Sequence, residues 1–282
     1  MITFRFDIDT RRVIVTRVPP LLDLLATYDV RASFFSVMGS DANLVEIVRL
    51  RLLADRSNKS PLNVTAKGGP ARIAAAALIP RGVGRANPGL LRRIVAQGHE
   101  LQPHGWSHIQ WQRTIDAIDV DAHLRLALRH YAQILGRPAT GFASPGRTFN
   151  DRALQAFDTA GLHYVGDMDG VAPFRPAGHR HLQLPITLFE TIALFETIAQ
   201  MRRRGLDDAA IVARYLSHIA EREHYCCLYE HPDDLGAGEL RIFARVFAHL
   251  RSRVRPSAVA WHGTRATRSD RRARPRVMVT RA

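Results

Sequence analysis

Five side chains of this sequence have types and spacings that suit hydrolysis at a metal ion. Asp7 and Asp9 stand two residues apart, His104 and His108 stand four apart, and His231 comes late in the chain. One carboxylate and two imidazoles form a three-ligand set that leaves a metal position open for water or substrate. A second carboxylate beside such a set can act as a general base, and a separate histidine as a general acid. Each pair is weak evidence alone, so the hypothesis depends on a fold that brings them together.

The elements expected around these residues alternate between strand and helix. We predict strands at residues 2–6, 31–37, a short stretch ending at His104, 140–144, 163–166, 182–187 and 225–229. We predict helices at residues 21–27, 44–54, 88–97, 120–135, 150–159, 207–221 and 239–250. Such alternation favours parallel β/α units. About seven units predict an α/β fold, a distorted and incomplete (β/α) barrel.

The polar patterns follow the predicted strands directly. In barrels of this kind the chemistry gathers at the carboxyl ends of the strands. We therefore expect one face of the fold to carry Asp7, Asp9, His104, His108, Asp167, Asp169 and His231.

Composition excludes several other classes of protein. The hydrophobic fraction of 46% argues against disorder over most of the 282 residues. No stretch reaches the ~18 consecutive apolar residues of a membrane-spanning helix. The first residues lack the apolar run of a secretory signal, which predicts a cytoplasmic site of action. Cys226 and Cys227 are adjacent, so we expect two buried thiols on a strand and no disulfide framework.

The basic charge is unevenly distributed along the chain. The formal net charge is +14, and residues 255–282 hold eight arginines and one aspartate. We interpret residues 255–282 as an arginine-rich, disordered tail and residues 1–254 as one catalytic domain. Residues 188–193 and 194–199 repeat the same hexapeptide, which we interpret as a local insertion.

Two motifs carry a resemblance to a known family. Residues 6–10, Phe-Asp-Ile-Asp-Thr, resemble the first motif of the polysaccharide deacetylases (carbohydrate esterase family 4). Residues 98–108, Gly-His-Glu-Leu-Gln-Pro-His-Gly-Trp-Ser-His, look like the second motif of that family. The resemblance covers roughly residues 2–250 and implies the barrel of the polysaccharide deacetylases.

The resemblance implies a role for each polar residue. Asp9, His104 and His108 would bind a divalent metal ion, and zinc, cobalt, manganese and nickel all suit these ligands. Asp7 would be the general base that activates the attacking water. His231 would protonate the departing amine. Asp167, or with less support Asp169, would orient His231.

Other positions leave alternatives open. Most family members carry an arginine near residues 143–146 that pairs with the base, and this chain has Ala143 there. Arg147 either substitutes from a shifted position, as part of the substrate site, or lies on the surface. Trp106 and Trp111 either line a substrate groove for sugar or lipid or pack in the core. His179 and His181 are expected to be solvated in a polar loop.

Within the family, the sequence looks most like members that deformylate an undecaprenyl-phosphate-linked 4-formamido-arabinose during lipid A modification. The resembling stretches are residues 18–25, 32–37, 86–87, 106, 111–112, 173–176 and 184–187. The expected substrate is therefore a lipid-linked amino sugar, at the anionic cytoplasmic face of an inner membrane. The alternatives are an N-acetyl sugar deacetylase, or an inactive homologue that binds anionic lipid or nucleic acid. No nucleic-acid motif is present, so no nucleic-acid partner is expected, and the oligomeric state stays open.

Overall fold

The computed structural model describes residues 2–39, 82–187, 198–222, 224–232 and 235–253. Several predictions lie outside these residues. They are the helix at 44–54, the tail at 255–282 and most of the hexapeptide repeat.

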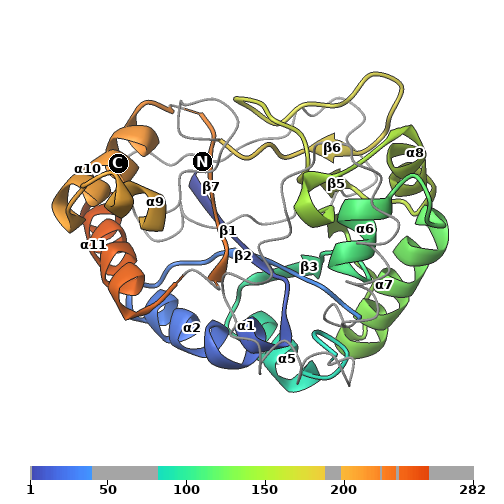
Figure 1. Ribbon diagram of the computed structural model, residues 1–282, viewed down its shortest axis with the longest axis horizontal. Helices are drawn as coiled ribbons and strands as arrows, with labels where there is room; N and C mark the ends of the chain where they lie inside the picture. The colour runs from blue at the N-terminus through green and yellow to red at the C-terminus, as the bar shows by residue number, and fades with distance from the viewer. Residues whose placement is uncertain (1, 40–81, 188–197, 223, 233–234, 254–282) are drawn as a thin grey trace, which may run out of the picture.

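Among the described residues, seven parallel strands in two sheets form the centre of the fold (Figure 1). The first sheet has the order β3-β2-β1-β7. It comprises β1 (Ile2–Ile8), β2 (Ser33–Ser36), β3 (Glu100–Pro103) and β7 (Cys226–Glu230). The second sheet, in the order β4-β5-β6, comprises β4 (Gly141–Phe142), β5 (Tyr164–Val165) and β6 (Leu182–Gln183).

Backbone hydrogen bonds join the two sheets at both edges. The Ala143 amide donates to the Pro103 carbonyl at 3.2 Å, between the ends of β4 and β3. The Thr187 amide donates to the Cys227 carbonyl at 3.1 Å, between the segment after β6 and β7. The strands therefore follow one another in chain order around a ring. This is the distorted, incomplete (β/α) barrel that the sequence predicts.

Helices surround the sheets on three sides (Figure 1). Along the lower edge lie α1 (Arg11–Thr16), α2 (Val18–Thr27) and α5 (Pro88–Ala96). On the right lie α6 (His108–Thr114), α7 (Val120–Leu135) and α8 (Asp151–Thr159). On the left lie α9 (Ile198–Arg203), α10 (Asp208–Ala220) and α11 (Ala237–Arg253). No helix among the described residues is both long and apolar enough to cross a bilayer.

Alternation along β1 separates the core from the barrel interior. Phe4 and Phe6 face the helices, where the Phe4 ring meets the Phe247 ring of α11 at a centroid distance of 4.9 Å. The residues between them face the other way, because successive strand side chains point to opposite faces. Arg5 lines a small cavity inside the barrel. Asp7 shares that inner face, so β1 directs both residues toward the same interior.

Candidate active site

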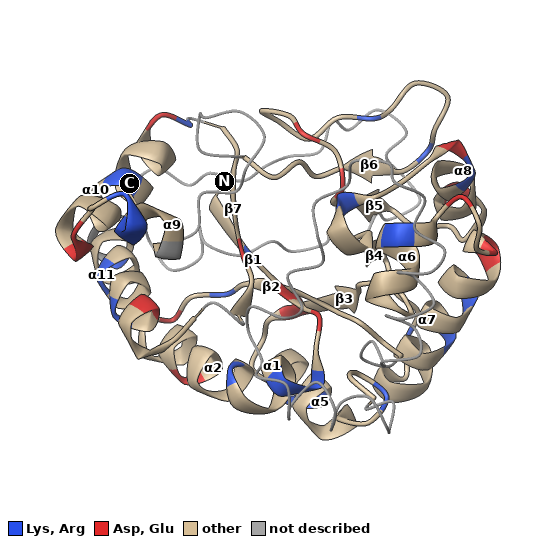
Figure 2. Cartoon of the chain, in the orientation of Figure 1, with Lys and Arg blue, Asp and Glu red and all other residues tan. Residues whose placement is uncertain are grey.

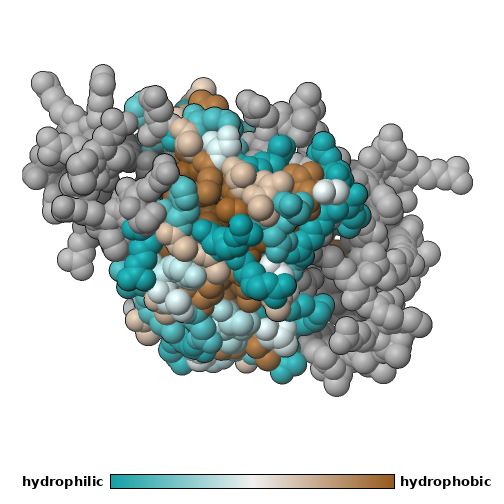
Figure 3. Space-filling model, turned by 90° about the vertical axis from the view of Figure 1, so that its left-hand side faces the viewer, coloured by the Kyte–Doolittle hydropathy of each residue, from teal (hydrophilic) through white to brown (hydrophobic). Residues whose placement is uncertain are grey.

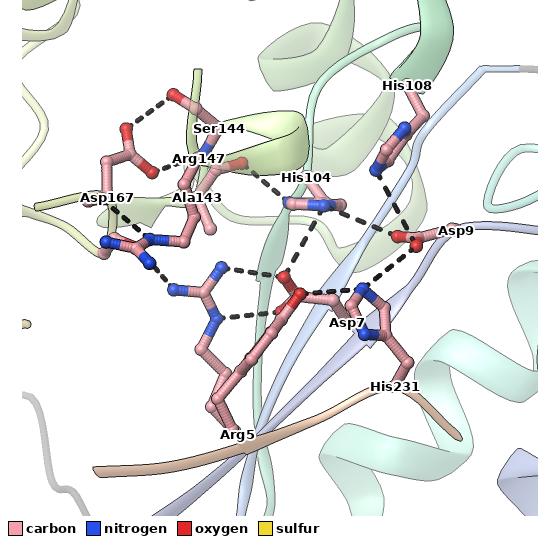
Figure 4. A network of polar contacts seen from close by, with 12 residues as sticks. Arg5, Asp7, Asp9, His104, His108, Ala143, Ser144, Arg147, Asp167 and His231 are labelled. Atoms are coloured by element: carbon pink, nitrogen blue, oxygen red, sulfur yellow. Dashed lines mark hydrogen bonds and ion pairs between the residues drawn. The ribbon is translucent and has the colours of Figure 1, made fainter. Parts of the chain in front are cut away.

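The predicted metal ligands come together at the carboxyl ends of β1 and β3 (Figure 4). The Asp9 Oδ1 atom lies 3.4 Å from His104 Nε2, and Asp9 Oδ2 lies 3.7 Å from His108 Nε2. One potential ligand atom from each residue lies within 4.8 Å of the other two. Asp9 therefore meets the distant His104 and His108 at one point, as their places after predicted strands led us to expect.

Local turns place each of these side chains. Asp9 follows β1 directly, and Thr10 then begins α1 by accepting a hydrogen bond from the Val13 amide at 3.2 Å. After β3, Gly105 adopts a φ of 80°, in the left-handed region that favours glycine. Ser107 caps α6 through the Gln110 amide, so His108 stands at the first position of that helix. A tight turn and a cap thus bring His104 and His108 together.

The polar atoms of His104 and Asp9 suit a bound cation. His104 Nδ1 lies 2.8 Å from the Ala143 carbonyl and donates its proton there, which leaves the Nε2 lone pair directed at Asp9. Burial lowers the pKa of His104 to about 4, so the ring is neutral. Asp9 Oδ1 is buried and has no hydrogen-bond partner. A bare imidazole nitrogen facing an unpartnered carboxylate oxygen is the arrangement that a divalent metal would complete.

Asp7 lies beside these ligands in a different environment. It is 2% exposed, and its Oδ2 atom lies 3.5 Å from His104 Nε2. Arg5 donates to both carboxylate oxygens, from Nε to Oδ1 at 2.8 Å and from Nη2 to Oδ2 at 2.7 Å. Burial alone would raise the pKa of Asp7, but the Arg5 guanidinium and nearby histidines lower it to about 2. Asp7 is therefore held as a carboxylate.

His231 enters the same cluster from the end of β7. Its Nε2 atom lies 3.5 Å from Asp9 Oδ2 and 2.7 Å from the Tyr229 hydroxyl. The side chain is 36% exposed, so it can be reached from solvent. The structure thus joins His231 to the four polar residues at β1 and β3, in agreement with its predicted position.

The structure does not bring Asp167 to His231. The Asp167 carboxylate accepts hydrogen bonds from the Ser144 amide, at 2.6 Å, and from the Ser144 hydroxyl. Burial raises the pKa of Asp167 to about 6. Asp169 is bound by Arg147 instead. Among the described residues, no hydrogen bond or ion pair joins either aspartate to His231, so the expectation that one of them orients this histidine is not supported. The neighbours of His231 are Tyr229 and Asp9.

Arg147 also lies apart from Asp7. Its guanidinium donates to the Asp169 carboxylate and, at 3.1 Å, to the Asp167 carbonyl. Arg147 adopts a φ of 54° in the turn η1 (Pro145–Arg147). The interpretation that Arg147 substitutes for the arginine that pairs with the base is therefore wrong, and a substrate contact by Arg147 stays a prediction.

The two tryptophans differ in their surroundings. Trp111 is completely buried beside Phe142 and Phe157, and its Nε1 donates to the Thr148 carbonyl at 2.8 Å. It belongs to the core, so the prediction that it lines a substrate groove is wrong. Trp106 is partly buried and stacks on His130 at a centroid distance of 4.8 Å. A substrate contact by Trp106 stays a prediction.

The expectation of solvated histidines in the loop before β6 is wrong as well. His181 is completely buried, and its Nδ1 lies 2.8 Å from Asp158 Oδ1. His179 Nδ1 lies 2.9 Å from the other oxygen of the same carboxylate. Asp158, on α8, thus binds the loop that carries His179 and His181.

Sequence reasoning missed Arg5 and Tyr229. Both stand on a strand two residues before a predicted site residue, Arg5 before Asp7 within β1 and Tyr229 before His231, which directly follows β7. Side chains two apart on a strand share a face. That spacing is the signal that identifies them.

Comparisons with known proteins identify relatives of this chain. The family model described as polysaccharide deacetylase matches residues 1–165. A protein of Shewanella sediminis, named probable 4-deoxy-4-formamido-L-arabinose-phosphoundecaprenol deformylase ArnD, is 27% identical over 194 residues, 65% of this chain and 62% of that protein. A protein of the same name from Wigglesworthia glossinidia brevipalpis is 24% identical over 184 residues, 61% of this chain and 63% of its own. The chain spans about six tenths of the length of these relatives.

Solved structures show a similar fold. A probable polysaccharide deacetylase from Pseudomonas aeruginosa PAO1 matches with a TM-score of 0.58 and 16% identity, over 89% of this chain and 84% of that one. Puue allantoinase matches with a TM-score of 0.57 and 16% identity, over 89% and 84% of the two chains. At this identity the likeness concerns the fold alone.

Proposed function

The chain belongs to the polysaccharide deacetylase family, and on that premise we propose that it is a metal-dependent amide hydrolase that removes the formyl group from a lipid-linked 4-formamido-arabinose. The observation that carries the proposal is the cluster of Asp7, Asp9, His104, His108 and His231. The choice of substrate is supported by the names of the two relatives.

Asp9, His104 and His108 would hold the metal ion. Their oxygen and nitrogen donors suit zinc, cobalt, manganese and nickel alike. When bound, such an ion acts as a Lewis acid that polarises the amide carbonyl and lowers the pKa of water.

The remaining residues supply the proton transfers. Asp7 accepts a proton from the attacking water, whose oxygen bonds to the formyl carbon. His231 donates a proton to the sugar nitrogen as the carbon–nitrogen bond breaks, because an amide nitrogen leaves poorly unless it is protonated. The products are the free amine and formic acid, which ionises to formate, and the catalyst is restored when Asp7 releases its proton to solvent and His231 takes one up.

We propose that this reaction takes place at the cytoplasmic face of an anionic inner membrane. An undecaprenyl-phosphate substrate is confined to the bilayer surface, and a formal net charge of +14 favours approach to anionic lipid. An N-acetyl sugar is the alternative substrate, since the same chemistry would release acetate.

The test is an assay of acid release by the purified protein. With added zinc, cobalt or manganese, we expect the lipid-linked formamido sugar to yield formate. Acetate release from an N-acetyl sugar, without formate release from the formamido sugar, would replace the formyl substrate by the alternative. Release of neither acid, in an assay where a deformylase control is active, would refute the proposal.

Two histidine variants form a matched pair for the metal assignment. His104→Ala should lose both the bound metal and the activity, since it removes a buried ligand. His163→Ala changes an exposed histidine outside the cluster and should retain both. Activity at the wild-type level in His104→Ala would contradict the ligand assignment.

A further inference from the structure

We infer that Arg5 is the positioning residue that gives the two aspartates their different duties, by holding Asp7 off the metal position so that Asp9 alone serves as the carboxylate ligand. This inference rests on the proposed function in one respect, which is the role of Asp7 as general base. The orientation of Asp7 is a separate matter that can be measured without any substrate.

Distance to His104 does not distinguish the two aspartates, although Asp9 also lies 3.7 Å from His108 Nε2. His104 Nε2 lies 3.4 Å from Asp9 Oδ1 and 3.5 Å from Asp7 Oδ2. Both carboxylates therefore lie beside the imidazole nitrogen that would bind the ion. A second carboxylate on the ion would remove the base and fill the position that water or substrate needs.

Hydrogen bonding distinguishes them. The Asp9 Oδ1 atom has no hydrogen-bond partner, whereas both oxygens of Asp7 accept from Arg5. A bidentate pair fixes the plane of the carboxylate as well as its position. Asp9 is thus left available to a cation, and Asp7 is oriented beside it.

Arg5 is itself held in place from several strands. Its Nη1 donates to the Gly166 carbonyl after β5, and its guanidinium lies 4.7 Å from the Phe35 ring centroid and 5.0 Å from that of Tyr229. The side chain is 3% exposed and lies inside the barrel, so it acts on Asp7 and does not reach substrate. The planar Arg5 guanidinium is held between the two rings and donates two hydrogen bonds to Asp7, and a flexible lysine would reproduce this pairing poorly.

The location of Arg5 also explains how Asp7 is paired although this chain has Ala143 where most family members carry an arginine nearby. Ala143 has no side chain that could pair with Asp7, and its carbonyl is already bonded to His104. Arg147 is engaged by Asp169 and the Asp167 carbonyl. The pairing that residues near Ala143 do not supply is therefore supplied by Arg5, on the strand that carries Asp7 itself.

The test uses cobalt as a spectroscopic probe of the site. Visible absorption of protein-bound Co²⁺ reports the number and kind of its ligands. We expect Arg5→Met to bind one Co²⁺ with an altered spectrum, because the released Asp7 carboxylate joins the ion. The double variant Arg5→Met/Asp7→Ala should return to the wild-type spectrum, since no second carboxylate is then present. Arg93→Met, which removes an exposed ion pair with Asp23, is the matched control.

A wild-type spectrum in Arg5→Met at full cobalt occupancy would overturn the inference. So would an altered spectrum that persists in the double variant. If Arg5→Met does not fold, Arg5→Lys replaces it, with the expectation of a smaller spectral change that Asp7→Ala again abolishes. In an active enzyme, Arg5→Lys should lower kcat at least about 10-fold with little change in KM, as for a group that acts only in the transition state. Failure of the proposed function would show separately, as the absence of acid release from the wild type with the spectral changes intact.

Discussion

At the scale of single residues, Asp7 and Asp9 show how neighbours decide the chemistry of identical side chains. Both end the same strand, and both lie near His104. Asp7 is paired with a buried guanidinium, whereas Asp9 has an unpartnered oxygen among three histidines. The sequence predicts both as site residues from their place after an apolar strand. Their separate duties could be given only by family resemblance, because the spacing of two aspartates does not show which one an arginine meets.

Asp7→Asn is the substitution that tests the base. Asparagine keeps the size of the side chain but cannot take up the proton of the attacking water, so we expect activity to fall about 10²–10⁴-fold. The metal should stay, because Asp9, His104 and His108 are unchanged. Acid release and metal content measured on the same preparation check this. Activity within about tenfold of the wild type would assign the base elsewhere.

Asp167 shows where prediction from sequence stops at this scale. Its place after a predicted strand led us to expect it on the catalytic face, and the family resemblance implied that it orients His231. The Ser144 amide and hydroxyl donate hydrogen bonds to the Asp167 carboxylate. The pattern of the strands does not reveal this pairing. The partner of a polar side chain depends on contacts between segments, and these are settled only by the fold.

At the scale of elements, the long amphipathic segments are predictable and the short ones are not. The helix expected at 120–135 coincides with α7, and α8 and α10 begin after the caps Asn150 and Asp207. By contrast α1 has six residues and α6 has seven, too few to show a helical period. The strand expected at 182–187 is only two residues long, and it stops before Pro185, which has no amide proton for the ladder. The short helix α6 matters most, since it carries His108.

Trp111→Phe tests the assignment of α6 to the core. It keeps an aromatic ring and removes the Nε1 donor, which leaves the Thr148 carbonyl unpaired. We expect the free energy of unfolding to fall by about 1–3 kcal/mol with KM unchanged. Urea denaturation and steady-state kinetics measure the two effects. A large rise in KM without loss of stability would restore the view that this tryptophan lines the substrate groove.

The junction of α5 and β3 should make stability depend on pH through His99. This histidine is 4% exposed, and its Nδ1 accepts a hydrogen bond from the Ala32 amide at 3.3 Å. Burial, with a smaller effect of Arg31, lowers its pKa from 6.5 to about 4. Between pH 6.5 and pH 4, His99 therefore binds a proton in the unfolded chain but stays neutral in the folded chain. The stability that neutral His99 contributes is present above pH 6.5 and is lost as the pH falls toward 4.

His99→Gln isolates that contribution, because glutamine can accept the same hydrogen bond without titrating. Between pH 6.5 and pH 4 we expect the wild type to lose on the order of 2 kcal/mol more than this variant. Urea denaturation at the two pH values gives the difference. The exposed His163→Gln serves as the control. Equal losses in the wild type and His99→Gln would rule out His99 as the source.

At the scale of the whole molecule, the ring of strands explains why residues so distant in sequence meet. β1 pairs with β2 and β7, and β2 pairs with β3, so the ends of these strands lie at one edge. Asp9, His104 and His231 follow three of them. The number and order of strands were predictable from alternation. The way the ring closes, through single hydrogen bonds at β3–β4 and β6–β7, was not.

Basic and acidic residues are interspersed along the part of the chain that the structure describes (Figure 2). Basic and acidic residues both occur on the surrounding helices, and acidic residues also lie near the centre (Figure 2). On the face turned to the left in Figure 1, hydrophilic residues occur throughout, with smaller hydrophobic areas between them (Figure 3). The face drawn in Figure 3 therefore does not by itself identify a side for approach to a membrane.

The sequence offers a different candidate for that approach, in residues 255–282. Their eight arginines and one aspartate supply +7 of the formal +14. Basic residues near an anionic bilayer contribute about 1 kcal/mol each, so removal of this segment should weaken binding to vesicles that contain anionic lipid by at least about 10-fold. Sedimentation of the full chain and of a chain ending at residue 254, over a range of salt, measures the difference, and zwitterionic vesicles serve as the control. Acid release from a soluble substrate should be unaffected, because the catalytic cluster lies within residues 7–231. Equal binding of the two chains to anionic vesicles would show that residues 255–282 are not a membrane tether.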